Sequence, residues 1–256
     1  MDPGALTSSG RIYFWQGASL WIGQGQGRTQ WHDHHAHQLA LALDDELRFR
    51  AGPEGRWLSY RGAVVLSHSK HQFEVDGIRI AHLFVEPESR AGRALVERYG
   101  REGVCSLPEE DAATARVVLS DAWASGADAV QMIAAASQAL ALLVGASTEP
   151  ATSLDPRLAK ALRHIRAHIR QPLTLANVSS VAHLSESRFR HLFVADTGTS
   201  FRAYLLWLRI NVAIEAVMAG ATWTEAAHEA GFADSAHLTR THKRMFGIEP
   251  TAVRRH

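Results

Sequence analysis

The first third of the chain carries the polar and apolar alternation of short β-strands. Between residue 11 and about residue 86, stretches such as "LALALDDELRFRA" and "FEVDGIRIAHLFVE" alternate or run apolar. Turn-forming segments, "GPEG" and "VDGI", interrupt them. Many short strands separated by such turns are typical of antiparallel barrels and sandwiches. The pattern therefore predicts a small antiparallel β-barrel or sandwich.

From about Glu88 the periodicity becomes helical, in "SRAGRALVERYG", "PEEDAATARVVLSDAWASG" and "ADAVQMIAAASQALALLVG". The last stretch is short and interrupted by Gln131, Ser137 and Gln138, which favours a packing helix over a membrane span. Residues 109–144 carry more apolar surface than an isolated helix pair needs. The two helices either cover the β-domain or form a dimer contact. The polar stretch "ASTEPATSLDP", residues 146–156, predicts a linker.

The last hundred residues contain an imperfect repeat of two helix pairs. In the first copy "LANVSSVAHL" precedes Ser185, a predicted N-cap, and "ESRFRHLFVADTG"; in the second, "WTEAAHEAGF" precedes "DSAHLTRTHKRMFG". The apolar face of each second helix consists of Phe189, Leu192 and Phe193 in one copy and of Leu238, Met245 and Phe246 in the other. A short helix, a tight turn and a second helix predict a helix-turn-helix in each copy.

The residues of the two turns differ. Ala227 is small enough for close helix approach, and Gly231 can take the left-handed conformation. The first copy has Ser179 and His183 at these places, and histidine tolerates positive φ better than most residues.

A predicted helix joins the two copies. Gly198 is expected to end one helix and Ser200 to cap the next, which runs to Gly220. About 20 helical residues span roughly 30 Å, close to the roughly 34–36 Å between successive major grooves on one face of DNA. One chain could thus place two recognition helices in adjacent grooves.

Charge is unevenly distributed between the two halves. Residues 154–256 hold 14 Lys and Arg against 8 Asp and Glu, a net of +6, whereas residues 1–153 hold 13 against 18, a net of −5; together they give the overall +1. A basic half suggests contact with a polyanion. The single cysteine, Cys105, excludes an internal disulfide and fits a reducing cytosol. No secretory signal is visible, so we expect a cytoplasmic protein.

Residues 154–256 resemble the AraC/XylS transcriptional regulators. The resemblance rests on "RFRHLF", "TGTSFRAYLLWLRINVA", "AAHEAGFADSAHLTRTHKRMFGIEP" and the terminal "AVRR", and it departs from the family at Ser179, His183 and Ala236. It implies sequence-specific binding to double-stranded DNA. The residues expected to reach base edges are Ser187, Arg190 and His191 in the first copy and Ser235, Ala236, Thr239 and Arg240 in the second. Those expected to meet phosphates, or to form salt bridges inside the domain, are Arg188, Arg202, Arg209, Lys243 and Arg244. The alternative for each arginine is a solvated surface charge.

The stretch "WHDHHAHQL", residues 31–39, places four histidines within six positions. Strand alternation would put His32, His34 and Gln38 on one face, and His35 and His37 on the other, at the solvent or a strand edge. An acidic β-domain ahead of this DNA-binding module looks like the cupin-type barrel with which many family members sense a ligand.

The spacing of His32, His34 and Gln38 resembles a cupin metal motif, which would draw His71 from a later strand. Imidazoles and a side-chain carbonyl suit Zn, Ni, Fe or Cu. Alternatively the cluster forms the floor of an effector pocket without a metal. The sequence identifies no partner for His68 or His82.

Together these patterns predict a two-domain α+β protein. An antiparallel, cupin-like sensing barrel occupies residues 1–105, a helical dimerisation or packing segment 106–146, a linker 147–155, and an all-α double helix-turn-helix domain 156–256. The predicted function is a ligand-responsive transcriptional regulator, homodimeric and not membrane-bound, with a small molecule or metal ion as effector.

Two alternatives remain: a cupin metalloenzyme of dioxygenase or isomerase type with a helical tail, and a constitutive DNA-binding protein with a purely structural barrel. Two capped turn motifs at groove spacing favour the regulator over the enzyme, since an enzyme has no need of them.

Overall fold

The computed structural model describes residues 4–145 and 154–255, and these form two units. Residues 4–145 together with 242–255 make the first unit, and residues 154–241 make the second. The last residues of the chain thus group with the β-rich unit, not with the helical region that precedes them. The predicted linker, residues 147–155, lies outside the described residues except for its last two positions.

The first unit is built on a nine-stranded sheet. The strands are β1 (Thr7–Trp15), β2 (Ala18–Arg28), β3 (His37–Ala42), β4 (Leu47–Ala51), β5 (Trp57–Tyr60), β6 (Gly62–Val65), β7 (His71–Val85), β8 (Val104–Ser106) and β9 (Val253–Arg255). Their order is β8-β6-β3-β7-β2-β1-β9, with β4 joining β7 and β5. All pairs are antiparallel except β9, which runs parallel to β1.

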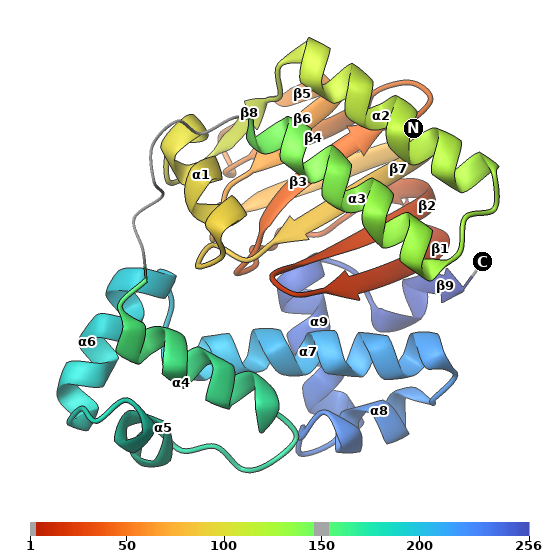
Figure 1. The fold of residues 1–256 in the computed structure, drawn as a ribbon. Coiled ribbons are helices and arrows are strands. Elements are labelled where there is room, and N and C mark those ends of the chain that lie inside the picture. The colour runs from red at the N-terminus through yellow and green to blue at the C-terminus, as the bar shows by residue number, and fades with distance from the viewer. Residues whose placement is uncertain (1–3, 146–153, 256) are drawn as a thin grey trace. The chain divides into compact units, whose positions relative to one another are not determined.

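The antiparallel sheet predicted from the alternation is confirmed, but a closed barrel is not shown. The end strands of the path, β8 and β9, do not pair with each other in the described part of the chain, so the sheet is open (Figure 1). The strand β7 links its parts, because His71–Glu74 pair with β4 and Ile80–Val85 pair with β3. Gly77, at φ 69°, lies where the register of β7 against β2 shifts by a β-bulge.

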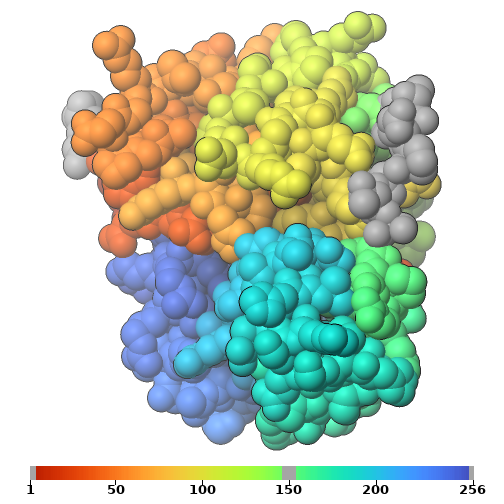
Figure 2. All heavy atoms as spheres, turned by 90° about the vertical axis from the view of Figure 1, so that its left-hand side faces the viewer, coloured from red at the N-terminus to blue at the C-terminus, as the bar shows by residue number. Residues whose placement is uncertain are grey.

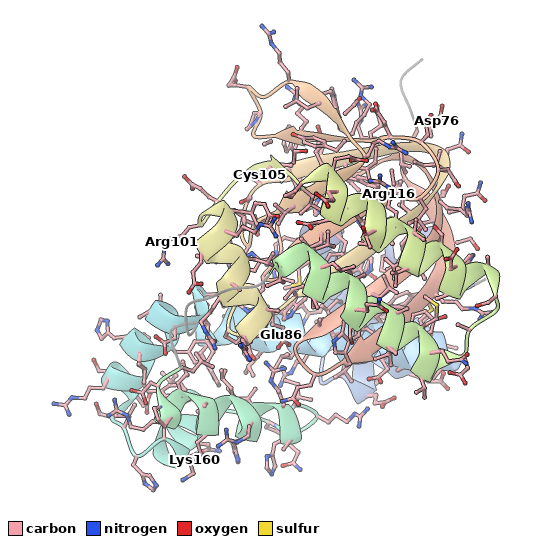
Figure 3. The ribbon with its side chains drawn as sticks, turned by 45° about the horizontal axis from the view of Figure 1, so that its top comes forward. Asp76, Glu86, Arg101, Cys105, Arg116 and Lys160 are labelled. Carbon is pink, nitrogen blue, oxygen red and sulfur yellow. The ribbon has the colours of Figure 1, made fainter. Side chains whose placement is uncertain are left out.

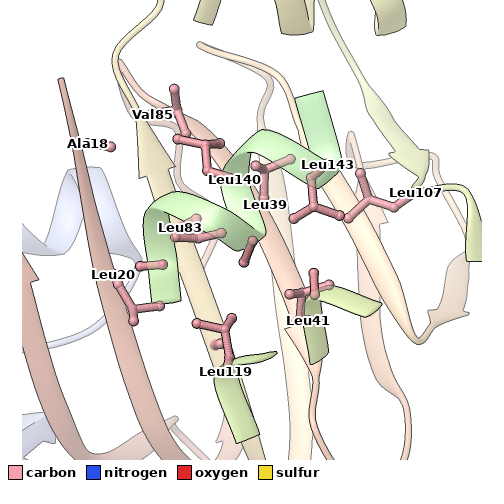
Figure 4. Close-up of a cluster of buried hydrophobic side chains, with 14 of the residues drawn as sticks. Ala18, Leu20, Leu39, Leu41, Leu83, Val85, Leu107, Leu119, Leu140 and Leu143 are labelled. Carbon is pink, nitrogen blue, oxygen red and sulfur yellow. The ribbon is translucent and has the colours of Figure 1, made fainter. Parts of the chain in front are cut away.

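The described part of the first unit holds three complete helices: α1 (Arg90–Tyr99), α2 (Glu109–Ala124) and α3 (Ala129–Val144). Leucines from the sheet and from α2 and α3 meet in one core, shown in Figure 4, which includes Leu20, Leu39, Leu41, Leu83, Leu119, Leu140 and Leu143. The helix pair therefore covers one face of the sheet, one of the two arrangements left open by the sequence. Arg116 of α2, labelled in Figure 3, is buried and donates to Glu109 at 2.6 Å.

The second unit is helical, with α4 (Pro156–Ala167), α5 (Leu175–Val181), α6 (Glu186–Thr197), α7 (Phe201–Ala219) and α8 (Trp223–Glu229). The helix α9 (Ser235–Phe246) begins in this unit, and its last turn groups with the first unit, ahead of a short 3-10 turn (Pro250–Ala252) and β9. Helices α5 and α6 lie side by side, drawn in teal in Figure 2. Phe189, Phe193 and Tyr204 fill the core beneath them. No helix of the described residues is long and apolar enough to span a membrane.

Candidate functional site

The two predicted helix-turn-helix motifs have turns built by the same backbone hydrogen bonds. In the first, Leu184 N donates to Ser179 O at 3.1 Å, and in the second Phe232 N donates to Ala227 O at 2.9 Å. His183 and Gly231 occupy the left-handed conformation in the respective turns, at φ 53° and 76°. The pairing of turn residues inferred from the sequence is therefore confirmed, including the positive φ of a non-glycine residue.

Each motif is fixed at its helix starts by side-chain caps. Thr174 and Ser185 cap α5 and α6, and Thr222 forms a capping box with Glu225 at the start of α8. Asp234, which the sequence reasoning had not assigned, accepts a bond of 2.6 Å from His237 N at the start of α9. Its place one residue before Ser235, with an acceptor side chain, is the signal that would have identified it.

The helix α7 joins the two motifs as the sequence predicted. Gly198 ends α6 in the left-handed conformation, Ser200 caps α7, and Gly220 ends α7. Its 19 residues correspond to a length of about 28 Å at 1.5 Å per residue. A rigid element of about the required length therefore separates the two motifs along the chain.

Most of the predicted DNA-contacting side chains are exposed, whereas the apolar face beside them is buried. Phe189 and Phe193 have no exposed surface. The exposed residues are Ser187, Arg188, Arg190, His191, Arg202, Ala236, Arg240 and Arg244, and the partly exposed ones are Ser235, Thr239, Arg209 and Lys243. The starts of α6 and α9 thus present polar and basic groups.

Arg209 and Lys243 make contacts within the protein. The Arg209 guanidinium lies against the turn of the second motif, so that a Cβ added to Gly231 would be 3.3 Å from its Nε. Burial lowers the pKa of this guanidinium from its usual range. Lys243 Nζ lies 2.6 Å from Glu249 Oε1. Arg209 thus packs against a turn of its own unit, and the phosphate contact or salt bridge expected of it stays a prediction.

A second candidate site lies inside the first unit, where three buried imidazoles converge. One ring nitrogen of each of His32, His34 and His71 lies within 4.8 Å of the other two. His32 and His71 are bridge partners, with backbone hydrogen bonds of 3.0 and 3.1 Å in both directions. Their ring centroids are 4.1 Å apart. The structure thus brings together the histidines that the sequence grouped.

The reason for this convergence differs from the one expected. Strand alternation was assumed across residues 32–38, but β3 begins only at His37, and the residues before it form no regular strand. The isolated bridge between His32 and His71 places the two rings together instead. Gln38 joins them, since its Oε1 lies 3.0 Å from His34 Nε2.

Backbone carbonyls determine which nitrogen of each histidine carries the proton. The Nδ1 atoms of His32, His34 and His71 lie 2.8–2.9 Å from the carbonyl oxygens of Gln30, Ala36 and Ser69, respectively. A carbonyl only accepts, so each Nδ1 must donate. Burial lowers the pKa of all three imidazoles, that of His32 to about 3, and keeps them neutral near pH 7. Each Nε2 is therefore a lone-pair donor directed into the cluster.

The side chain of Gln38 extends this network to His82. Its Nε2 lies 2.9 Å from His82 Nδ1, and burial lowers the pKa of His82 to about 3. His82, for which the sequence offered no partner, is thus part of the site. Nδ1–H of a metal-bound histidine commonly donates to a backbone carbonyl, so the donor set fits a transition-metal ion.

The expectation that His35 and His37 face solvent or a strand edge is wrong, because both are buried. His35 Nε2 lies 3.0 Å from Glu88 Oε2, and His37 Nδ1 accepts a bond of 3.0 Å from Ser67 N. His68 is exposed, with Nδ1 4.0 Å from Asp33 Oδ1. Residues 31–36 follow an irregular path, so histidines from both faces of the expected strand are buried. The alternation of a regular strand could not predict this.

Comparisons with known proteins agree with the helical geometry. Residues 178–256 match the family model of a helix-turn-helix domain. The regulatory protein PocR of Salmonella typhimurium is 30% identical over 110 residues, which are 42% of this chain and 36% of PocR. The probable transcriptional regulator LumQ of Photobacterium leiognathi is 27% identical over 89 residues, 34% of this chain and 36% of LumQ. The chain thus spans about a third of the length of these curated relatives.

The solved structures of ToxT from Vibrio cholerae share the fold across nearly the whole chain. An apo variant superposes with a TM-score of 0.56 at 8% identity, covering 96% of this chain and 94% of ToxT. The form with a bound unsaturated fatty acid has a TM-score of 0.51 at 9% identity, covering 96% and 91%. At such identities the likeness establishes the two-domain α+β fold.

Proposed function

We propose that this chain, whose C-terminal region is an AraC-type helix-turn-helix domain, is a ligand-responsive transcriptional regulator. It binds double-stranded DNA through the starts of α6 and α9, and its β-rich unit senses a small molecule or metal ion. The observation that carries the DNA-binding part is the duplicated turn geometry: two motifs with the same hydrogen bonds, each presenting an exposed polar helix start. A helix in the major groove reads bases from such a position.

Within this proposal the chemistry of each exposed side chain decides whether it contacts a base or a phosphate. Arg190 and Arg240 are suited to bidentate bonds with guanine, and the methyl group of Ala236 to contact with thymine. Ser187, His191, Ser235 and Thr239 supply further contacts at base edges. Arg188, Arg202, Lys243 and Arg244 face phosphates, and Arg209 supports the second turn from within.

The buried histidines suggest the chemistry of the effector. ToxT has been solved with an unsaturated fatty acid, a largely apolar ligand. In this chain the β-rich unit directs imidazole lone pairs into a buried cluster. Lone pairs favour a metal cation or a small ligand that donates hydrogen bonds. We therefore place the effector site at His32, His34, Gln38 and His71.

We further propose a cytoplasmic homodimer. Cys105 is a free thiol, which suits a reducing compartment. Although α2 and α3 bury their inner faces, Val117 and Val130 remain 58% and 76% exposed on their outer sides. These valines would lie in the subunit contact. Light scattering of the full chain and of a Val117→Lys, Val130→Lys double variant tests this: a dimer should become a monomer, and a monomeric wild type contradicts the dimer.

The DNA-binding part is tested by selecting duplexes from a random library with the full chain and then titrating the selected duplex at several salt concentrations. A protein that neutralises several phosphates should lose affinity steeply as salt rises, while scrambled duplexes should bind at least about a thousandfold more weakly. Selection that yields no preferred sequence would overturn the proposal. So would affinity that does not change with salt.

A further inference from the structure

The C-terminal segment of the chain packs directly against the histidine cluster. Gln30 N donates to Gly247 O at 2.8 Å, immediately beside His32. Gly247 has φ 69°, and a Cβ built on it would collide with the carbonyl oxygen of Gln30 and lie 2.6 Å from His32 Nδ1. Glycine is thus required twice, for the backbone conformation and for the close approach. Only a residue without a side chain allows this turn to seat on His32.

The Gln30 carbonyl, which lies against Gly247, also sets the orientation of the His32 ring. The Gln30 carbonyl receives the Nδ1–H of His32 at 2.9 Å, and this bond directs Nε2 toward His34 and His71. Such outer bonds position a ligating imidazole and raise its basicity. Any change in the position of Gly247 therefore affects the hydrogen bond between His32 Nδ1 and the Gln30 carbonyl, which positions the His32 ring.

His71 Nε2 is fully buried without a hydrogen-bond partner. His34 Nε2, an acceptor because Nδ1 donates to Ala36, faces the Gln38 Oε1 acceptor at 3.0 Å. Two acceptors at this separation repel unless a cation lies between them or the amide rotates. Ligand atoms bound about 2.1 Å from one tetrahedral metal lie about 3.4 Å apart, so the observed spacing is close to that of a pair sharing an ion.

The segment that seats on His32 is continuous with the second recognition helix. Gly247 follows Phe246, the last residue of α9, and α9 begins at Ser235 with the residues proposed to read DNA. The last turn of α9 groups with the unit that holds the histidines. Phe246 also packs edge-on against Phe84, with ring centroids 5.9 Å apart. The metal-facing histidines and the DNA-reading helix are therefore linked by a few contiguous residues.

We propose that His32, His34, His71 and Gln38 bind one divalent transition-metal ion, and that the ion holds the Gly247 turn in place and so controls α9. With the ion bound, the buried Nε2 of His71 gains a partner and His32 is fixed under Gly247. Without it, the lone pairs repel, His32 shifts, and the turn loosens. The control of α9 rests on the proposed DNA-binding function, but the metal site does not.

Metal binding is measured by titrating the metal-free full chain with Co²⁺ and recording the visible absorption, with Zn²⁺ as a competitor. One equivalent should bind, and His71→Ala should weaken binding at least about a hundredfold. His168→Ala is the matched control, because His164 of α4 and His168, the residue that follows this helix, form another imidazole pair with centroids 4.2 Å apart. Equal binding by wild type and His71→Ala would overturn the site.

A variant that binds metal more tightly complements His71→Ala, because misfolding could explain a loss of Co²⁺ affinity but not a gain. Gln38→Glu keeps the size of the side chain and replaces a neutral oxygen donor by a carboxylate, which hard and borderline cations bind more strongly. Co²⁺ affinity should rise about tenfold or more. Unchanged or weaker binding would show that Gln38 Oε1 does not face the ion.

The coupling is tested with Gly247→Ala, with Gly198→Ala as the control. Gly198 ends α6 at φ 71° with no atom within 4 Å of an added Cβ, so it carries the same backbone strain without the collision. Gly247→Ala should lower Co²⁺ affinity roughly tenfold, and Gly198→Ala should leave it unchanged, because coupling is reciprocal. Equal affinities in the two variants would overturn the link between Gly247 and the ion.

The effect on α9 has its own readout. Hydrogen exchange of residues 242–250 in the wild type should slow when Co²⁺ or Zn²⁺ is added, and affinity for the selected duplex should change by about fivefold or more. Exchange and duplex affinity that do not respond to metal would overturn the control of α9. If metal binds but no sequence-specific duplex is found, the proposed DNA-binding function fails and the metal site stands.

Discussion

His35 Nε2 lies 3.0 Å from Glu88 Oε2, and both side chains are only 2% exposed. The contact joins residues 53 positions apart, the first just before β3 and the second just after β7. Replacing His35 by alanine removes this buried hydrogen bond and the packing of the imidazole ring. His35→Ala should therefore lower the free energy of unfolding by about 1–3 kcal/mol or more, measured by urea denaturation.

The control for this prediction is His191→Ala, which removes an exposed imidazole from α6. Its stability should stay within about 0.5 kcal/mol of wild type. If His35→Ala were as stable as His191→Ala, the buried pair would contribute nothing. That result would restore the expectation from strand alternation, which placed His35 at the solvent or at a strand edge.

Arg240→Ala should weaken binding to the selected duplex by about 1–3 kcal/mol and relax discrimination at one base position. The side chain is exposed near the start of α9, where a bidentate bond to guanine is possible. Arg101→Ala, an exposed arginine of the β-rich unit, is the control and should leave affinity unchanged. Fluorescence anisotropy with single-base variants of the duplex measures both effects. Wild-type affinity and selectivity in Arg240→Ala would exclude this residue from base recognition.

Arg202 and Arg209 are both on α7 and should respond differently to replacement by alanine. Arg202 is exposed, so Arg202→Ala should reduce the salt dependence of DNA binding by about one phosphate without changing stability. Arg209 packs against the Gly231 turn, so Arg209→Ala should lower stability through lost packing. Thermal unfolding and salt titrations of both variants measure the difference. The roles assigned to the two arginines are wrong if Arg202→Ala lowers stability while Arg209→Ala changes only the salt dependence of DNA binding.

His183→Gly should raise stability by roughly 0.5–1 kcal/mol. A side chain at φ 53° crowds the following carbonyl, and the second motif already has glycine at the equivalent place, at φ 76°. The substitution also removes the contact of His183 Nε2 with Lys160 Nζ at 3.3 Å, so Lys160→Ala serves as the control. Urea denaturation of both variants separates the contribution of backbone strain at His183 from that of its contact with Lys160. A loss of stability larger in His183→Gly than in Lys160→Ala would contradict the strain argument.

Stability should fall as the pH drops below about 6.5. Burial lowers the pKa of His32 and His82 to about 3 and that of His37 to about 4, so these groups stay neutral in the folded chain while the unfolded chain takes up protons. Their contribution is complete above about pH 6.5. It is lost as the pH falls from that value to about 3 for His32 and His82 and to about 4 for His37, by up to about 1.4 kcal/mol per pH unit for each group.

The measurement is urea denaturation with a chelator near pH 7.5, 6 and 5. His37→Gln removes one titrating group, so its stability should decline less steeply over this range. A wild type equally stable at all three pH values would show that these histidines are protonated alike in the folded and unfolded chain.

The helical unit could be predicted closely because its information is local. Ser185, Ser200 and Gly198 act within one turn of their own helices, so cap preferences and the 3.6-residue period suffice to place them. The left-handed position of His183 followed from its alignment with Gly231 in the second copy. The contact of Arg209 with Gly231 could not be predicted, because it depends on how α7 packs against a turn 22 residues later.

The histidine site was predicted in its membership but not in its construction. His32, His34 and His71 come together as expected, yet the path of residues 31–36 depends on long-range partners: His71 for His32 and Glu88 for His35. A period of two has no meaning outside a regular strand, which is why the burial of His35 and His37 was missed. The open sheet was missed for the same reason, since alternation specifies faces but not whether the edges meet.

The parallel pairing of β9 with β1 can form only after the whole chain has been synthesised, because the two strands lie at opposite ends of the sequence. Residues Ser8–Gly10 leave the ribosome about 240 residues before their partners Val253–Arg255, a delay of roughly 10–50 seconds at typical translation rates. Until then the outer edge of β1 carries unpaired backbone groups that another nascent chain could capture. A cell making this protein at high level would therefore need chaperones most during that interval, and slower translation of the helical unit would lengthen the exposure.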